Sequence, residues 1–172
     1  MLHKLLFVQI FIVVLGLVST QALTSDAAPA EVEIQELLDF RADTQLSKQT
    51  QTPILVLFSM EGCAYCHYVE EEHLKPMLRN AGYREKVIIR RVMIDNLNFI
   101  VDIDGTSITN DEFANRYNAS HTPTVIFLNH QGKTLTSQLQ GVQNTEFYGH
   151  YLDNNLDQSI SKIRQQLVTA TL

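Results

Sequence analysis

Two cysteines, the only ones in the chain, stand close together as Cys63-Ala64-Tyr65-Cys66. A thiolate can attack the disulfide of another molecule, and a second thiol nearby can then resolve the mixed disulfide that forms. Two intervening residues bring both sulfurs within bonding reach on one helical turn. The pair therefore predicts thiol–disulfide exchange, with Cys63 as the attacking thiol and Cys66 as the resolving one.

The residues around this pair predict where it sits. The apolar run at residues 54–58 reads as a buried strand, and a helix is expected from Cys63 to about Asn80, kinked or restarted at Pro76. A helix N-terminus offers unpaired amide protons and the positive end of the helix dipole. Both favour a thiolate, so a lowered pKa is expected for Cys63.

The same residues are also compatible with other uses. The pair could form a static structural disulfide, although so short a loop removes little entropy from the unfolded chain. The two sulfurs could also bind a metal together with His67 and His73, but no second group of ligands accompanies them. Finally, residues 63–67 satisfy C-x-x-C-H, the attachment signature of c-type haem.

A visible absorption spectrum separates the haem carrier from the exchange protein. Thiol–disulfide exchange needs no chromophore, so we expect the purified chain to show no Soret band. A Soret band in protein produced with haem-attachment machinery would contradict the exchange assignment.

The rest of the chain alternates helices and strands. The order is α-β-α-β-α-β-β-α, which predicts an α/β domain with a mixed sheet covered by helices on both faces. Thr109 and Glu112 fit a capping box that opens the third helix. The further expected elements are helix 31–48, strand 87–94, an irregular connection at 95–107, helix 109–117, strands 124–128 and 134–139, and helix 145–167.

The N-terminus has the layout of an export signal. A weakly basic start precedes an apolar stretch, and small residues follow up to Ala22. We expect a signal peptide at residues 1–22, which could instead be retained as an anchor, then a linker at 23–30 and one domain at 31–172. Export places the two cysteines in an oxidising compartment, periplasmic or extracellular. A net charge of -6 in 172 residues argues against a nucleic-acid partner.

Gly62 and the cysteine pair follow a strand, and Thr122-Pro123 precedes a hairpin with Gly132. These two features together resemble the thioredoxin family. The resemblance covers roughly residues 31–170. Within the family, the chain most resembles the exported bacterial thioredoxin-like proteins of the SoxW and thioredoxin-2 type. It implies a thioredoxin fold: a central mixed four-stranded sheet flanked by helices, here with an extra N-terminal helix.

The resemblance also implies roles for individual residues. Pro123 would be cis and would face the disulfide, and with Thr122 it would line the groove for the substrate backbone. Ala64 and Tyr65, between the cysteines, and His67, after them, would tune the redox potential. His121 is a further residue expected near the same mouth.

An exported thiol–disulfide oxidoreductase follows from the resemblance, with a redox-inactive binding module as an alternative. It would need no metal and no organic cofactor. Its partners would be protein thiols and disulfides and a membrane electron donor, and it would act as a monomer. The chain has little room for the dimerisation domain of periplasmic isomerases, so we expect a reductase rather than an isomerase.

Two positions depart from the thioredoxin pattern. Gly62 stands where thioredoxins carry a tryptophan, and Leu57 stands where they carry a buried aspartate that helps to deprotonate the resolving thiol. Cys66 must therefore lose its proton to water or to another base. Glu70 and Glu71 are candidates, although the sequence favours reading both as solvated residues of a helix face.

Overall fold

The computed structural model describes residues 31–170, and the residues from Val32 onward form one compact unit. The predicted signal peptide at 1–22 and linker at 23–30 lie outside the described residues. Within the described part of the chain, every helix is too short or too polar to cross a membrane.

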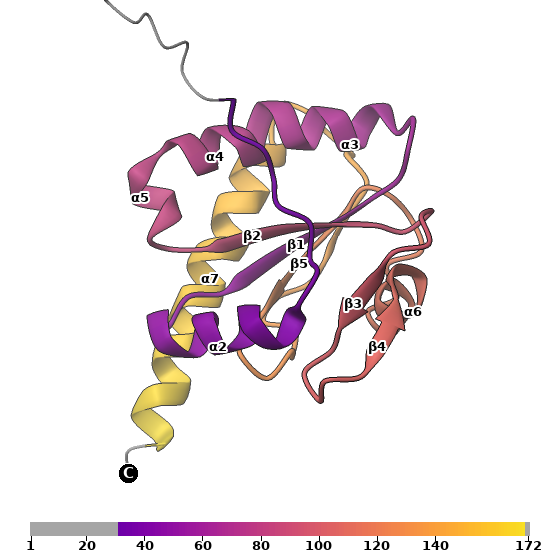
Figure 1. The fold of residues 1–172 in the computed structure, drawn as a ribbon. Coiled ribbons are helices and arrows are strands. Elements are labelled where there is room, and N and C mark those ends of the chain that lie inside the picture. The colour runs from indigo at the N-terminus through magenta and orange to yellow at the C-terminus, as the bar shows by residue number, and fades with distance from the viewer. Residues whose placement is uncertain (1–30, 171–172) are drawn as a thin grey trace, which may run out of the picture. The chain divides into compact units, whose positions relative to one another are not determined.

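A four-stranded mixed sheet forms the centre of the fold (Figure 1), in the order β2-β1-β5-β6. β1 runs parallel to β2 and antiparallel to β5, and β6 is antiparallel to β5. All six residues of β1 are buried, as its continuous apolar run predicts. The bounds are β1 Ile54–Ser59, β2 Ile88–Met93, β5 Thr124–Leu128 and β6 Leu139–Gln140.

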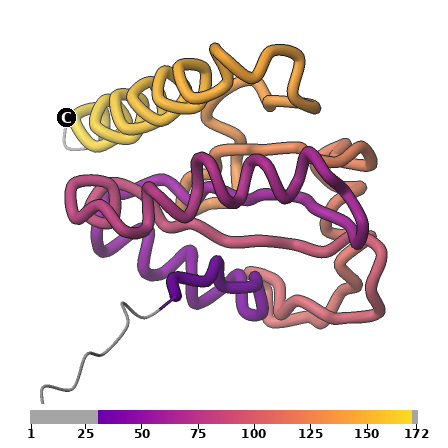
Figure 2. The backbone as a smooth tube through the Cα atoms, turned by 90° about the horizontal axis from the view of Figure 1, so that it is seen from above, coloured from indigo at the N-terminus to yellow at the C-terminus, as the bar shows by residue number. Residues whose placement is uncertain are grey.

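Two hydrophobic clusters lie on the two faces of this sheet. The side chains of β1 alternate between them: Leu55 and Leu57 belong to one cluster, and Val56 and Phe58 to the other. The first cluster is covered by α3, α4 and α7, and the second by α2 and α6; α7 and α2 lie on opposite sides of the strands (Figure 2). The helices are α2 Phe40–Thr50, α3 Ala64–Val69, η1 Glu70–Leu74, α4 Lys75–Arg79, α5 Ala81–Arg84, α6 Asn110–Arg116 and α7 Tyr148–Ala170.

The N-terminal helix is present, but its predicted start is wrong. It begins at Phe40, after Asp39 caps it by accepting a hydrogen bond from the Ala42 amide at 2.9 Å. The residues before it run extended along β2, where the Leu37 amide donates to the Arg91 carbonyl at 2.9 Å. Ile34 and Leu37 are both buried, three residues apart, but in different clusters. Their spacing matches that of a helix, but the segment is extended and the two side chains enter the cores on opposite faces of the sheet.

The helix after Cys63 changes its geometry before the proline. α3 widens into the π-helical turn η1, and α4 then begins with Pro76 in its first turn. A proline has no amide proton and its ring clashes with the carbonyl four residues earlier, so the preceding turn must open. The sequence predicts a kink or a new helix at Pro76, whereas in the structure the helix changes to π-helical geometry one turn earlier.

The stretch predicted to be irregular at 95–107 contains a hairpin. β3 (Phe99–Val101) pairs with β4 (Ser107–Thr109) as a separate two-stranded sheet. Only Ile100 is fully buried in these short strands, so no regular alternation marked them in the sequence. The capping box of Thr109 and Glu112 that opens α6 is confirmed, with both of its hydrogen bonds formed.

β5 has its predicted bounds, but the strand after it does not. Thr134 pairs with Leu128 only as an isolated bridge, and regular pairing resumes at β6 with a register shifted by two residues. The two extra residues leave most of the stretch predicted as a strand outside the ladder. The final helix likewise starts later than predicted, at Tyr148.

Candidate active site

The two cysteines form a disulfide at the start of α3. The sulfur–sulfur distance is 2.07 Å and the Cα atoms lie 5.2 Å apart. The sulfurs are not equivalent, because Cys63 is half-buried whereas Cys66 is only 2% exposed. A partner molecule therefore reaches Cys63 first.

Cys63 occupies the cap position of α3. Its sulfur accepts a hydrogen bond from the Cys66 amide at 3.1 Å, and its carbonyl accepts one from the His67 amide at 3.1 Å. An amide hydrogen bond and the positive end of the dipole both favour negative charge on that sulfur. The turn that brings the chain there from β1 needs Gly62, which adopts φ +70°, a conformation that side chains with a Cβ rarely take.

The Thr122–Pro123 segment reaches this disulfide through the Thr122 side chain. The Thr122 hydroxyl donates to the Cys63 sulfur at 3.7 Å, and the peptide bond between Thr122 and Pro123 is cis. Pro123 is buried and directly precedes β5, so the central strand of the sheet fixes this segment. His121 is exposed, and no described contact joins its side chain to the disulfide.

The three predicted tuning residues form the exposed rim of the disulfide. Ala64 and His67 are exposed, and Tyr65 keeps 57% of its surface accessible. Ala64, His67 and both cysteines line one shallow groove. The structure thus brings together Cys63, Cys66, Ala64, His67 and Thr122, with Tyr65 pointing outward between the cysteines.

The same groove contains a partly buried ion pair that sequence reasoning missed. Glu70, read from the sequence as a solvated residue, is 8% exposed, and its carboxylate accepts from Arg91 at 3.1 Å. The Ser59 hydroxyl also donates to it at 3.5 Å. Glu70 follows Cys66 by one helical turn, which the sequence does show, but Arg91 comes from β2 and only the sheet brings it here.

Glu71 does lie at the surface, as expected. It accepts from Lys75 at 2.7 Å, and this hydrogen bond holds the pKa of the Glu71 carboxyl below its ordinary value. Leu57, at the position of the missing aspartate, is fully buried in the cluster beneath α3. The carboxylate that shares the groove with Cys66 is therefore that of Glu70.

The alternative metal site is not assembled. Within residues 31–170 no group of three or more His, Cys, Asp or Glu side chains lies close enough to hold a metal ion. His73 packs instead between Tyr68 and Tyr148, with ring centroids 5.3 Å and 5.2 Å away. Burial there lowers the pKa of His73.

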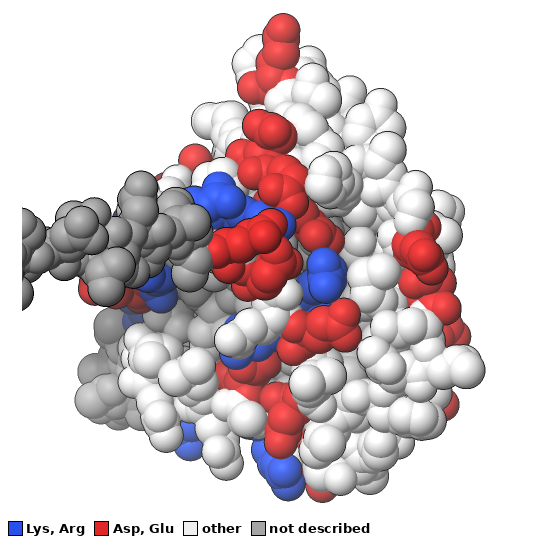
Figure 3. Space-filling model, turned by 45° about the horizontal axis from the view of Figure 1, so that its top comes forward, with Lys and Arg blue, Asp and Glu red and all other residues white. Residues whose placement is uncertain are grey.

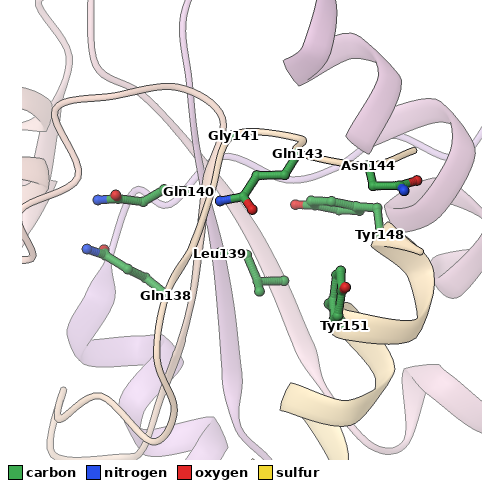
Figure 4. Close-up of a pocket in the computed structure, with 8 residues that line it drawn as sticks. All are labelled: Gln138, Leu139, Gln140, Gly141, Gln143, Asn144, Tyr148 and Tyr151. Carbon is green, nitrogen blue, oxygen red and sulfur yellow. The ribbon is translucent and has the colours of Figure 1, made fainter. Parts of the chain in front are cut away.

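A separate pocket lies between β6 and the start of α7 (Figure 4). Leu139 and Gln143 face Tyr148 and Tyr151 across it, and no charged residue lines it. Burial raises the pKa of Tyr148, which is 3% exposed. Neither cysteine lines this pocket, which is distinct from the shallow groove that holds the disulfide at the start of α3.

A family match identifies the class of protein. Residues 40–155 match the family described as thioredoxin-like domain, and the chain belongs to that family. The matched region includes β1, the disulfide, the Thr122–Pro123 segment and most of the cover of both sheet faces. No curated protein matches the chain.

Solved structures with a similar fold are distant in sequence. Mitochondrial thioredoxin 3 from Saccharomyces cerevisiae, in its oxidized form, has 16% identity and a TM-score of 0.49 over 72% of this chain and 93% of that one. Thioredoxin from Fasciola hepatica has 16% identity and a TM-score of 0.49, covering 73% and 99%. A thioredoxin-fold protein from Helicobacter pylori has 19% identity and a TM-score of 0.42, covering 69% and 86%.

The ion pair of Glu70 and Arg91 predicts opposite effects of two substitutions. Glu70→Gln removes a negative charge beside the sulfurs, so the thiol pKa of the reduced protein should fall; Arg91→Gln removes a positive charge, so that pKa should rise. The thiolate ultraviolet absorbance followed against pH measures both. Glu71→Gln, at the surface, is the matched control and should change the thiol pKa least. Shifts of the same sign in the first two variants would contradict the electrostatic account.

Proposed function

We propose that this chain is an exported thiol–disulfide oxidoreductase in which Cys63 is the nucleophile and Cys66 the resolving thiol. The observation that carries the proposal is the asymmetry of the disulfide. The sulfur of Cys63 is reachable and receives an amide hydrogen bond, while that of Cys66 is buried behind it. Membership of the thioredoxin-like family supports the same chemistry.

The reaction runs from the reduced pair in two steps. The Cys63 thiolate attacks one sulfur of the substrate disulfide, forms a mixed disulfide and releases the other substrate sulfur as a thiolate. Cys66 then loses its proton and attacks the Cys63 sulfur, which releases the second substrate thiol. The substrate has gained two electrons, and the Cys63–Cys66 pair is left oxidised.

The segment before β5 would hold the substrate during this exchange. Thr122 already contacts the Cys63 sulfur through its hydroxyl, and Pro123 is fixed beside it. A substrate chain laid over this segment has its reacting sulfur next to Cys63. The rim residues Ala64, Tyr65 and His67 border the same sulfur and would tune its potential.

The proposal includes location, partners and direction. Export rests on the sequence of residues 1–22, which also places the cysteines where disulfides persist. Periplasmic or secreted protein disulfides would be the substrates, and a membrane electron donor would return the oxidised pair to the dithiol. A reductase of the SoxW and thioredoxin-2 type fits this cycle better than an isomerase.

Trapping the mixed disulfide tests the roles of the two cysteines. Cys66→Ser should accumulate a covalent complex with a disulfide substrate such as insulin, because the resolving thiol is gone. Cys63→Ser should form no complex and should lose insulin reduction, since Cys66 is buried. If the unsubstituted chain reduces insulin no faster than Cys63→Ser, the catalytic assignment is refuted, and background rates in both proteins would favour a redox-inactive binding module.

The reduction potential of the Cys63–Cys66 pair tests the direction. A reductase is expected near about -270 mV, the range of thioredoxin, whereas an oxidant lies near about -120 mV. Equilibration with glutathione or dithiothreitol buffers of known ratio measures it. A value at the oxidising end would overturn the assignment as a reductase without affecting the exchange chemistry.

A further inference from the structure

Apolar side chains stand exposed beside the disulfide loop. Leu97 is 91% exposed and Phe99 59%, both on the loop and hairpin that follow β2. Met60 and Tyr65, from the segment that carries the disulfide, are 42% and 57% exposed. One exposed apolar residue is ordinary at a protein surface, but several around one reactive group mark an interaction site.

Hydrogen bonds join the two segments that carry these side chains. The Glu61 amide donates to the Asp95 carboxylate at 2.8 Å, and the Ile94 amide donates to the Ser59 carbonyl at 2.9 Å. Glu61 is next to Met60, and Asp95 is two residues from Leu97. Leu97 therefore stands on a loop that is tied directly to the turn before Cys63.

The loop that carries Leu97 is held in a defined shape. The Asn110 side chain donates to the Met93 carbonyl at 2.9 Å and to the Asn96 side chain at 2.8 Å. The Asn98 amide also donates to the Asn96 side chain, at 3.1 Å. These bonds fix the backbone on both sides of Leu97 while its own side chain stays in solvent. An apolar group ordered in advance costs little entropy when a partner covers it.

The surroundings of this apolar group are acidic. Residues 95–115 contain no lysine or arginine, and Glu61 adds a further exposed carboxylate beside Met60. Over the face seen in Figure 3, acidic side chains are widespread and basic ones form small separate groups. The acidic border consists of Asp95, Asp104, Asp111 and Glu112, whereas Asp102 is buried and paired with Arg116.

We propose that Leu97 and Phe99, together with Met60, form a docking surface for the protein partners of the exchange reaction. The fitting partner segment carries apolar side chains flanked by lysine or arginine, which pair with the acidic border. This inference rests on the proposed function for the identity of the partner. The surface would bind a basic and apolar segment whether or not any disulfide is exchanged.

Binding of a peptide without cysteine tests the surface apart from the chemistry. The probe is a fluorescent peptide with leucines around a serine and two arginines at each end. The control peptide, its twin, has glutamates in place of the arginines. We expect the full chain to bind the arginine peptide about tenfold more tightly than the twin at low salt, and the difference to shrink at high salt. Equal affinities would overturn the proposed partner chemistry.

Substitutions locate the binding on the surface. Leu97→Ser, and Leu97→Ser combined with Phe99→Ser, should weaken binding of the arginine peptide by about five- to tenfold. Val168→Ser is the matched control, because Val168 is also exposed, at 65%, but lies on α7 near the C-terminus, far from the disulfide end of the molecule (Figure 1). Unchanged binding in the double variant would overturn the docking surface.

A parallel measurement keeps the two proposals distinct. The unsubstituted chain is assayed for exchange with hydroxyethyl disulfide, a substrate too small to reach Leu97 while it reacts at Cys63. Exchange without peptide binding would leave the proposed function intact and refute the docking surface. Peptide binding that depends on Leu97, without any exchange, would support the docking surface and refute the proposed function.

Discussion

The burial of β1 is the constraint on which the rest of the structure depends. This strand is covered on both faces and pairs with β2 on one side and β5 on the other. Its end therefore has a fixed position, and the turn at Gly62 places Cys63 at the cap of α3. Because β5 is its direct neighbour, the start of β5 brings Thr122 and Pro123 to the same edge. The strand thus assembles both halves of the site through backbone pairing alone.

The electrostatic setting of the disulfide combines local and distant contributions. The amide of Cys66 and the end of α3 favour a thiolate at Cys63, and both arise within one helical turn. Glu70 adds a negative charge one turn further on, and Arg91 from β2 opposes it. A buried carboxylate without such a partner would be costly, so the pair also explains how Glu70 can lie under the groove. The reactivity of the pair depends on the balance of these charges.

Chemistry and recognition are carried by different parts of the chain. The sulfurs and the Thr122–Pro123 segment belong to the core of the fold, whereas Leu97 and Phe99 belong to a hairpin at its side. The hydrogen bond between Glu61 and Asp95 connects them. Such a division lets the hairpin vary with the partner while the buried strands keep the reacting atoms in place.

The sequence alone determined the elements whose signals are local. The continuous apolar runs located β1 and β5, the apolar residues of 87–94 located β2 despite two arginines, and the capping box located α6. The cysteine pair after a strand, together with Thr122-Pro123, predicted thiol–disulfide exchange and the family. The tertiary structure decided what depends on neighbours distant in the chain. Residues 35–39 are extended because they bond to Arg91 of β2 and Val101 of β3, although Ile34 and Leu37 are spaced as in a helix. Glu70 is buried because Arg91 of β2 pairs with it on the sheet face that α3 covers, and Leu97 stands outward because Asn110 fixes its loop. Hydrophobic periodicity reports burial but not the partner that causes it, and so these features could not be read from the chain itself.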